Sequence, residues 1–425
     1  MSIFEHIESN VRSYCRAFPD LFARARGSRL ITEDGREFID FWAGAGTLNY
    51  GHNNPRLKQK LIEYIEKDGL AHALDLSTAA KRDFLDRFEQ VILKPRHLDY
   101  KVQFPGPTGT NAIEAALKLA RKVKKRHNVI CFTNAYHGMT LGALSATGNA
   151  SKRAGAGISL ANVTHMPFDG YGDGTIPTLD YLEAVLDDEG SGVDKPAAVI
   201  LETVQAEGGV KVASLEWLSR LQSIVHQRDI LLIIDDIQTG CGRTGPFFSF
   251  EEAGLQPDIV CLSKSISGFG LPMALVLLAR DLDIWKPGEH NGTFRGNNLA
   301  FVTATEALGY WENDDLSQEV ARKAKVARER LEGIAGQLGE GASVRGRGLI
   351  QGLVCRAPGM AERISRRAFE RGLVIETAGV RSEVVKLLPA LTISDEELKQ
   401  GLDLLEESAR AVLDEVELEA PQSVA

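Results

Sequence analysis

The stretch LLIIDDIQTG (residues 231–240) begins with an apolar run of strand length and places a carboxylate, Asp235, where that run ends. A second apolar run, DIVCLSKS (residues 258–265), leads in the same way to Lys264. Short apolar runs bounded by polar residues are typical of buried strands in a mainly parallel sheet. Two neighbouring strands of this kind would bring a carboxylate and an amine into one site.

This pair of side chains favours a site for pyridoxal 5′-phosphate (PLP). An amine can form a Schiff base with that cofactor, and a carboxylate can keep the ring nitrogen protonated, so that the ring takes up electrons from a substrate carbanion. Either residue alone is a weak indication, because an Asp at a strand end is often a loop cap and a Lys there usually reaches water. The interpretation depends on the two residues together.

Further apolar runs extend the same pattern on both sides and alternate with helical segments. They are NVICFTN (128–134), AAVILE (197–202) and ALVLLA (274–279). The alternation predicts an α/β fold with a large, mainly parallel sheet and a smaller α+β domain. We expect three regions: an N-terminal arm with part of the small domain (1–65), a large cofactor-binding domain (66–315) and a C-terminal small domain (316–425). Within the first, SRLITEDGREFIDF (28–41) predicts a β-hairpin.

Composition narrows the class of partner. The 425 residues are 44% hydrophobic and 25% charged, which is typical of a globular protein with a large core. A net charge of −9 argues against nucleic-acid and anionic-membrane partners, which attract basic surfaces. Five scattered cysteines show neither metal-ligand spacing nor a disulfide framework, and no apolar run approaches the roughly 18 residues of a membrane span. Free thiols, no metal and a cytoplasmic location are expected.

A glycine-rich loop runs directly into a helix at GPTGTNAIEAALKLARK (106–122). Such a loop directs free backbone N–H groups at an anion, so a phosphate could bind at Gly109 and Thr110. Taken alone, the segment is more often an ordinary capped helix start. It matches neither the dinucleotide fingerprint nor the P-loop pattern.

Two further segments carry candidate residues for the cofactor. In NAYHGMTLGALS (134–145), Tyr136 and His137 follow an apolar run, and an aromatic side chain there can stack on a cofactor ring. By itself, this tripeptide is more often a packed turn. In GTFRGNN (292–298), Thr293 lies in a glycine-flanked loop suited to close backbone approach, and it is uninterpretable alone.

Set in this order, these segments resemble the class III aminotransferases over essentially the whole chain. The resemblance implies PLP fold type I, with Lys264 as the Schiff-base lysine and proton shuttle and Asp235 as the partner of the pyridine nitrogen. It further implies Gln238 at the cofactor's phenolic oxygen, Tyr136 on the ring, Gly109 and Thr110 at the phosphate, and Thr293 reaching the phosphate from a neighbouring subunit. The active unit would then be a homodimer or a dimer of dimers.

The substrate pocket departs from the family pattern. In ETVQAEGGV (202–210), Glu202 and Glu207 match two family glutamates, and in the ornithine and 4-aminobutyrate members the second pairs with an arginine and moves aside for a substrate carboxylate. Here VVKLLPAL (384–391) carries Lys386 in place of that arginine, and a lysine is a point charge rather than a planar fork. Glu207 and Lys386 are therefore the candidate substrate residues.

Two milder departures accompany it: Asp236, where most relatives carry glutamate, and Ala45, where ornithine aminotransferase carries a substrate-binding tyrosine. The pocket is accordingly expected to differ from that of ornithine aminotransferase.

Four segments carry a closer resemblance within the family: residues 7–19, 43–55, 106–122 and 235–240. It implies L-glutamate as the amino donor and L-aspartate 4-semialdehyde as the acceptor. The alternatives within the fold are a 4-aminobutyrate, ornithine or acetylornithine aminotransferase and an aminomutase. From other classes, a PLP-free scaffold and a nucleotide-binding module remain, although the intact Lys264, Asp235 and Gln238 count against both.

Overall fold

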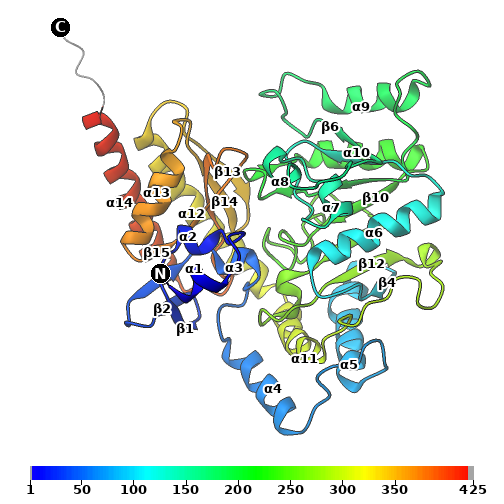
Figure 1. Cartoon of the computed structure of the whole chain (residues 1–425), viewed down its shortest axis with the longest axis horizontal. Helices are drawn as coiled ribbons and strands as arrows, with labels where there is room; N and C mark the ends of the chain where they lie inside the picture. The colour runs from blue at the N-terminus through cyan, green and yellow to red at the C-terminus, as the bar shows by residue number, and fades with distance from the viewer. Residues whose placement is uncertain (1, 420–425) are drawn as a thin grey trace.

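A seven-stranded sheet forms the centre of the larger of two lobes (Figure 1). Its strands, in spatial order, are β4 (Tyr100–Gln103), β12 (Leu275–Ala279), β11 (Ile259–Leu262), β10 (Leu231–Asp235), β7 (Ala198–Leu201), β5 (Val129–Phe132) and β6 (Val163–Met166). The strands from β11 to β6 pair in parallel, whereas β12 is antiparallel to both of its neighbours. The mainly parallel sheet expected from the sequence is confirmed in this computed structural model, which describes residues 2–419.

Both faces of this sheet are covered, which explains why its strands are almost entirely apolar. In β10, Leu232 and Ile234 belong to one hydrophobic core, and Leu231 and Ile233 belong to the other. The first core includes α5 (Ala79–Phe88), α9 (Thr178–Asp187), α10 (Leu215–Gln227) and α11 (Asn298–Ala307); the second includes α6 (Gly109–Lys124) and α7 (Leu141–Ser145). Successive side chains of a strand point to opposite faces, so both cores are built from the same strands.

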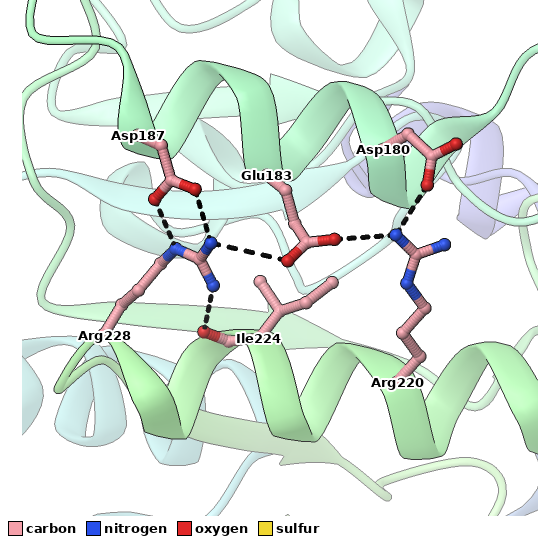
Figure 2. Close-up of polar contacts among 6 residues, drawn as sticks. All are labelled: Asp180, Glu183, Asp187, Arg220, Ile224 and Arg228. Carbon is pink, nitrogen blue, oxygen red and sulfur yellow. Dashed lines mark hydrogen bonds and ion pairs between the residues drawn. The ribbon is translucent and has the colours of Figure 1, made fainter.

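Charged side chains, several of them solvent-exposed, join α9 to α10 (Figure 2). Arg228 makes two hydrogen bonds of 2.7 and 2.6 Å with Asp187, and it lies 3.4 Å from Glu183. Arg220 contacts Asp180 at 2.5 Å and Glu183 at 2.6 Å. Glu183 therefore lies between the two arginines and links their ion pairs into one network.

The smaller lobe contains both ends of the described chain (Figure 1). Its sheets are β1 (Phe22–Arg26), β2 (Arg29–Thr32), β3 (Glu37–Asp40) and β15 (Leu373–Val374), and β13 (Ser343–Arg347), β14 (Ile350–Val354), β17 (Val384–Leu387) and β16 (Glu376–Ala378). Its helices are α12 (Asp315–Leu338), α13 (Met360–Glu370) and α14 (Asp395–Glu419). The hairpin expected at residues 28–41 is confirmed by the antiparallel pair β2/β3, and β3 pairs in parallel with β15.

Short elements connect and surround the lobes. They are α1 (Ile3–Ile7), α2 (Tyr14–Ala17), α3 (Ala43–Gly46), α4 (Pro55–Glu66), α8 (Ala150–Arg153), β8 (Val204–Gln205), β9 (Lys211–Val212), and the short helices η1 (Glu89–Leu93), η2 (Lys94–Arg96), η3 (Lys264–Ser267), η4 (Arg280–Leu282) and η5 (Leu308–Trp311). No helix between residues 2 and 419 is long and apolar enough to cross a membrane. The domain boundaries at 65/66 and 315/316 stay a prediction, and residues 420–425 of the third region lie outside the described chain.

A small apolar core connects the lobes where the functional residues gather. Val204, Ala206 and Val210, which follow β7 of the larger lobe, pack against Ile350 of β14 and Val384 of β17. The chain that carries Glu207 is thereby held against the sheet that carries Lys386.

Candidate functional site

The carboxyl ends of four parallel strands converge on one cavity of about 320 Å³. Tyr136 and His137 follow β5, Glu202 follows β7, Asp235 ends β10 and Lys264 follows β11, and all five line this cavity. This is the sheet edge at which open α/β folds bind their ligands. The strands therefore bring together residues that lie more than a hundred positions apart in the chain.

Lys264 occupies the first position of η3 in a left-handed backbone conformation, with φ of +51°. This conformation is uncommon for a residue with a side chain, and such outliers concentrate at functional sites. The next residue fixes the turn, because Ser265 Oγ donates a 2.7 Å hydrogen bond to the carbonyl of Gly46. Burial lowers the pKa of Lys264, so its amine loses its proton more readily than an exposed lysine does.

Asp235 and His137 form a buried pair. Nδ1 of His137 lies 2.7 Å from Oδ2 of Asp235, and the other oxygen of Asp235 accepts a 3.2 Å hydrogen bond from the amide of Ile237. Burial opposes a charged imidazole, yet the hydrogen bond to Asp235 raises the pKa of His137 overall. Nε2 of His137 is buried and has no hydrogen-bond partner within residues 2–419. The carboxylate is thus held in place from two sides.

The start of α6 forms part of the cavity wall. Thr108, Gly109 and Thr110 line the cavity at the helix N-terminus, where the first backbone N–H groups have no partner within the helix. Thr110 Oγ1 lies 2.6 Å from Thr140 Oγ1. A Cβ added at Gly109 would come within 2.9 Å of Ile237, so the glycine permits close packing at this point.

Tyr136, Glu202 and Gln238, which also line this cavity, contact the backbone around it. The amide of Tyr136 donates a 2.8 Å hydrogen bond to Oε1 of Glu202, and burial raises the pKa of that glutamate. Nε2 of Gln238 donates a 2.8 Å hydrogen bond to the carbonyl of Ala45, another residue with positive φ. The side chains of Glu202 and Gln238 are therefore each held by a hydrogen bond with the backbone.

The two predicted substrate residues are in direct contact. Nζ of Lys386 lies 2.5 Å from Oε1 of Glu207 and 3.1 Å from Oε1 of Glu376, and the lysine side chain is completely buried. Although burial works against its charge, the two carboxylates raise the pKa of Lys386. The ammonium group is thus shared between two carboxylates in this structure.

Thr293, in contrast, lines neither of the two cavities that contain Lys264. It is exposed, and its carbonyl accepts a 2.8 Å hydrogen bond from Nε2 of His72. Sequence reasoning missed Thr140, whose hydroxyl connects Thr110 to Glu114, and Glu376 beside Lys386. The isolated acidic residue in the apolar segment GLVIETAG (372–379) was the available signal for Glu376.

The chain is similar to known proteins over almost its whole length. The sequence model of the family described as aminotransferase class-III matches residues 14–408. The chain is 60% identical over 418 residues to the diaminobutyrate–2-oxoglutarate transaminase of Bordetella parapertussis, covering 98% of this chain and 96% of that protein. It is 59% identical over 405 residues to the protein of the same name from Nocardia farcinica, covering 95% and 93%.

Among solved structures, an ornithine aminotransferase from Toxoplasma gondii matches with a TM-score of 0.84 and 27% sequence identity, over 97% of this chain and 94% of that one. That structure has partial occupancy of PLP at its active site.

Proposed function

Because the chain belongs to the class III aminotransferase family, we propose that it moves the amino group of L-glutamate to L-aspartate 4-semialdehyde, giving L-2,4-diaminobutyrate and 2-oxoglutarate. The observation that carries the reaction class is the single cavity lined by Lys264, Asp235 and the N-terminus of α6. The choice of substrates is supported by relatives that are about as long as this chain and share the name diaminobutyrate–2-oxoglutarate transaminase.

The lining of the cavity fits PLP, the cofactor of this family. The free amides of α6 at Gly109 and Thr110 suit a phosphate, and Asp235 suits a protonated pyridine nitrogen. Tyr136 offers an aromatic surface for the ring, and Lys264 offers an amine. When bound, PLP supplies an aldehyde that condenses with amines and a ring that accepts electrons from the substrate Cα.

The residues of the chain supply orientation and proton transfer. Since burial lowers the pKa of Lys264, its amine is available to take the proton from the substrate carbon that bears the reacting amine and to deliver a proton to the cofactor. His137 and the amide of Ile237 hold the Asp235 carboxylate in place and keep it as a hydrogen-bond acceptor. We assign Gln238 to the cofactor's phenolic oxygen, and Glu202 to positioning Tyr136 through its amide.

Glu207 and Lys386 are proposed to handle the two different substrates. Lys386 is closed off by Glu207 in this structure, and displacement of Glu207 would expose the ammonium group to a substrate carboxylate. A lysine offers one point charge, which suits a single carboxylate oxygen rather than the two-pronged contact of an arginine. Ala45 leaves space where ornithine aminotransferase carries a tyrosine, which favours a substrate other than ornithine.

The working unit is proposed to be a homodimer or a dimer of dimers in the cytoplasm. Thr293 is exposed and does not line the cavity of its own subunit. This position suits a residue that contacts the cofactor phosphate of a neighbouring subunit. The five cysteines are free thiols, which suits a reducing compartment.

The proposed reaction is tested by the rate of amino transfer to 2-oxoglutarate from L-2,4-diaminobutyrate, L-ornithine and 4-aminobutyrate, with purified protein and added PLP. We expect the highest kcat/KM with diaminobutyrate. A preference for ornithine or 4-aminobutyrate would retain the aminotransferase and reject the substrate, and product formation from a single substrate would indicate an aminomutase.

A further inference from the structure

A second cavity of about 550 Å³ adjoins the first on the side of the smaller lobe. Tyr136, Glu207 and Lys264 line both cavities, so the second opens onto the reactive amine. Its far wall is formed by α2 and by residues 376–380 of the smaller lobe. A substrate whose amine reacts beside Lys264 would therefore extend its remaining groups into the second cavity.

Glu376 is the unusual group in that wall. It begins β16 and faces Lys386 of β17 as a direct cross-strand neighbour, and its side chain is 6% exposed. Its Oε1 lies 3.1 Å from Nζ of Lys386 but accepts no hydrogen bond from any residue between 2 and 419. Glu207 already holds that lysine at 2.5 Å. Two carboxylates thus share one buried ammonium group, and Oε1 of Glu376 is left as a buried acceptor without a hydrogen bond in the described chain.

We propose that Glu376 binds the second ammonium group of the substrate, the one that does not react. This inference rests on the proposed function. L-2,4-Diaminobutyrate carries two amines, so when one reacts beside Lys264 the other is left to pair with a carboxylate in the adjoining cavity. L-Aspartate 4-semialdehyde carries the same non-reacting ammonium group, whereas 4-aminobutyrate has none, and the only amine of glutamate is the one transferred.

The charges around Glu376 set the direction of its pH dependence. The carboxyl of Glu376 interacts electrostatically with Lys386, Glu207, Lys264 and Tyr14. Burial raises the pKa of Glu376 above that of an exposed glutamate. Glu376 therefore keeps its proton to higher pH than usual and binds a cation well only once that proton is lost. The kcat/KM for diaminobutyrate, relative to that for glutamate, should rise as pH increases through this raised pKa.

The two half-reactions of the PLP-loaded enzyme test the assignment separately. In Glu376→Gln, we expect the kcat/KM of the diaminobutyrate half-reaction to fall about 10- to 100-fold, the range for a lost hydrogen bond between charged groups. The glutamate half-reaction and any turnover of 4-aminobutyrate should stay close to those of the parent enzyme, and the pH-dependent rise should disappear. Glu383→Gln is the matched control, because the Glu383 carboxylate lies beside Gly379 of the same cavity wall and accepts a hydrogen bond from the amide of Arg381.

Several outcomes would overturn this role for Glu376. An equal fall in both half-reactions would show that it only positions Lys386, and an unchanged ratio would show no role in recognition. If the glutamine variant does not fold, Glu376→Asp and the pH profile of the parent enzyme test the proposal instead. A ratio of kcat/KM for diaminobutyrate to kcat/KM for glutamate that does not change with pH would reject it. A parent enzyme that does not turn over diaminobutyrate would instead reject the proposed function, and this inference with it.

Discussion

Lys264 combines the two properties that a proton-transferring amine needs: a fixed position at the end of β11 and a pKa lowered by burial. Lys264→Ala should reduce kcat by about 10²- to 10⁴-fold or more, because it removes both the amine and the base. PLP should still bind through the start of α6, so the variant should retain cofactor after gel filtration but lack the absorbance of the lysine-bound form. Near-parent turnover would refute the assignment of Lys264.

We expect Asp235 to support electron uptake by the cofactor ring and to contribute little to the stability of the fold. Asp235→Asn replaces the ionic partner of the ring nitrogen with a neutral group, and we expect each half-reaction, measured by stopped flow, to slow by about 10²- to 10³-fold. Asp236→Asn is the control, because Asp236 is buried and accepts hydrogen bonds from Thr239 Oγ1 and the amide of Ser249. We expect Asp236→Asn to lower the melting temperature while leaving the half-reaction rates close to those of the parent enzyme. The reverse pattern would exchange the roles of the two aspartates.

At the scale of helices, the network between α9 and α10 contains two arginines whose ion pairs should differ in strength (Figure 2). The Arg228 side chain is 19% exposed and bonds both oxygens of Asp187, whereas that of Arg220 is 48% exposed. Arg228→Ala should lower the free energy of unfolding by about 1–2 kcal/mol. Arg220→Ala should cost about 0.5 kcal/mol or less, because exposed pairs are screened by solvent. Urea denaturation measures both, and equal losses would contradict this ranking.

The same scale shows what the sequence could and could not predict. The buried strands, the hairpin at residues 28–41 and the start of α6 were predictable, because apolar runs, turn residues and a glycine-rich loop act locally. The antiparallel direction of β12 was not, since an apolar run carries no direction. The sequence also did not predict that His137 contacts Asp235 or that Glu376 contacts Lys386. Both contacts depend on the pairing of strands that are distant in the chain.

At the scale of the whole molecule, exposed apolar side chains gather around the loop that carries Thr293. Phe294 is 68% exposed and its ring contacts His72, while Leu74 and Leu76 lie in the same segment as His72 and are also exposed. Met139 lines the cofactor cavity and is exposed as well. Apolar surface of this kind is typical of an interface between subunits. A dimer formed there would bring the loop that carries Thr293 close to a partner's site.

Mixed dimers test whether Thr293 serves the neighbouring site. Lys264→Ala homodimers should be inactive, and Thr293→Asp homodimers should lose PLP because a carboxylate would repel the phosphate. In a mixed dimer of the two variants, the site with an intact Lys264 would receive the intact Thr293 from its partner only if the residue acts across the interface. We therefore expect activity to reappear on mixing under conditions that exchange subunits, measured on tagged heterodimers. If Thr293 acts within its own subunit, the intact Lys264 always lies in the chain that carries the Thr293→Asp substitution, and mixing restores nothing.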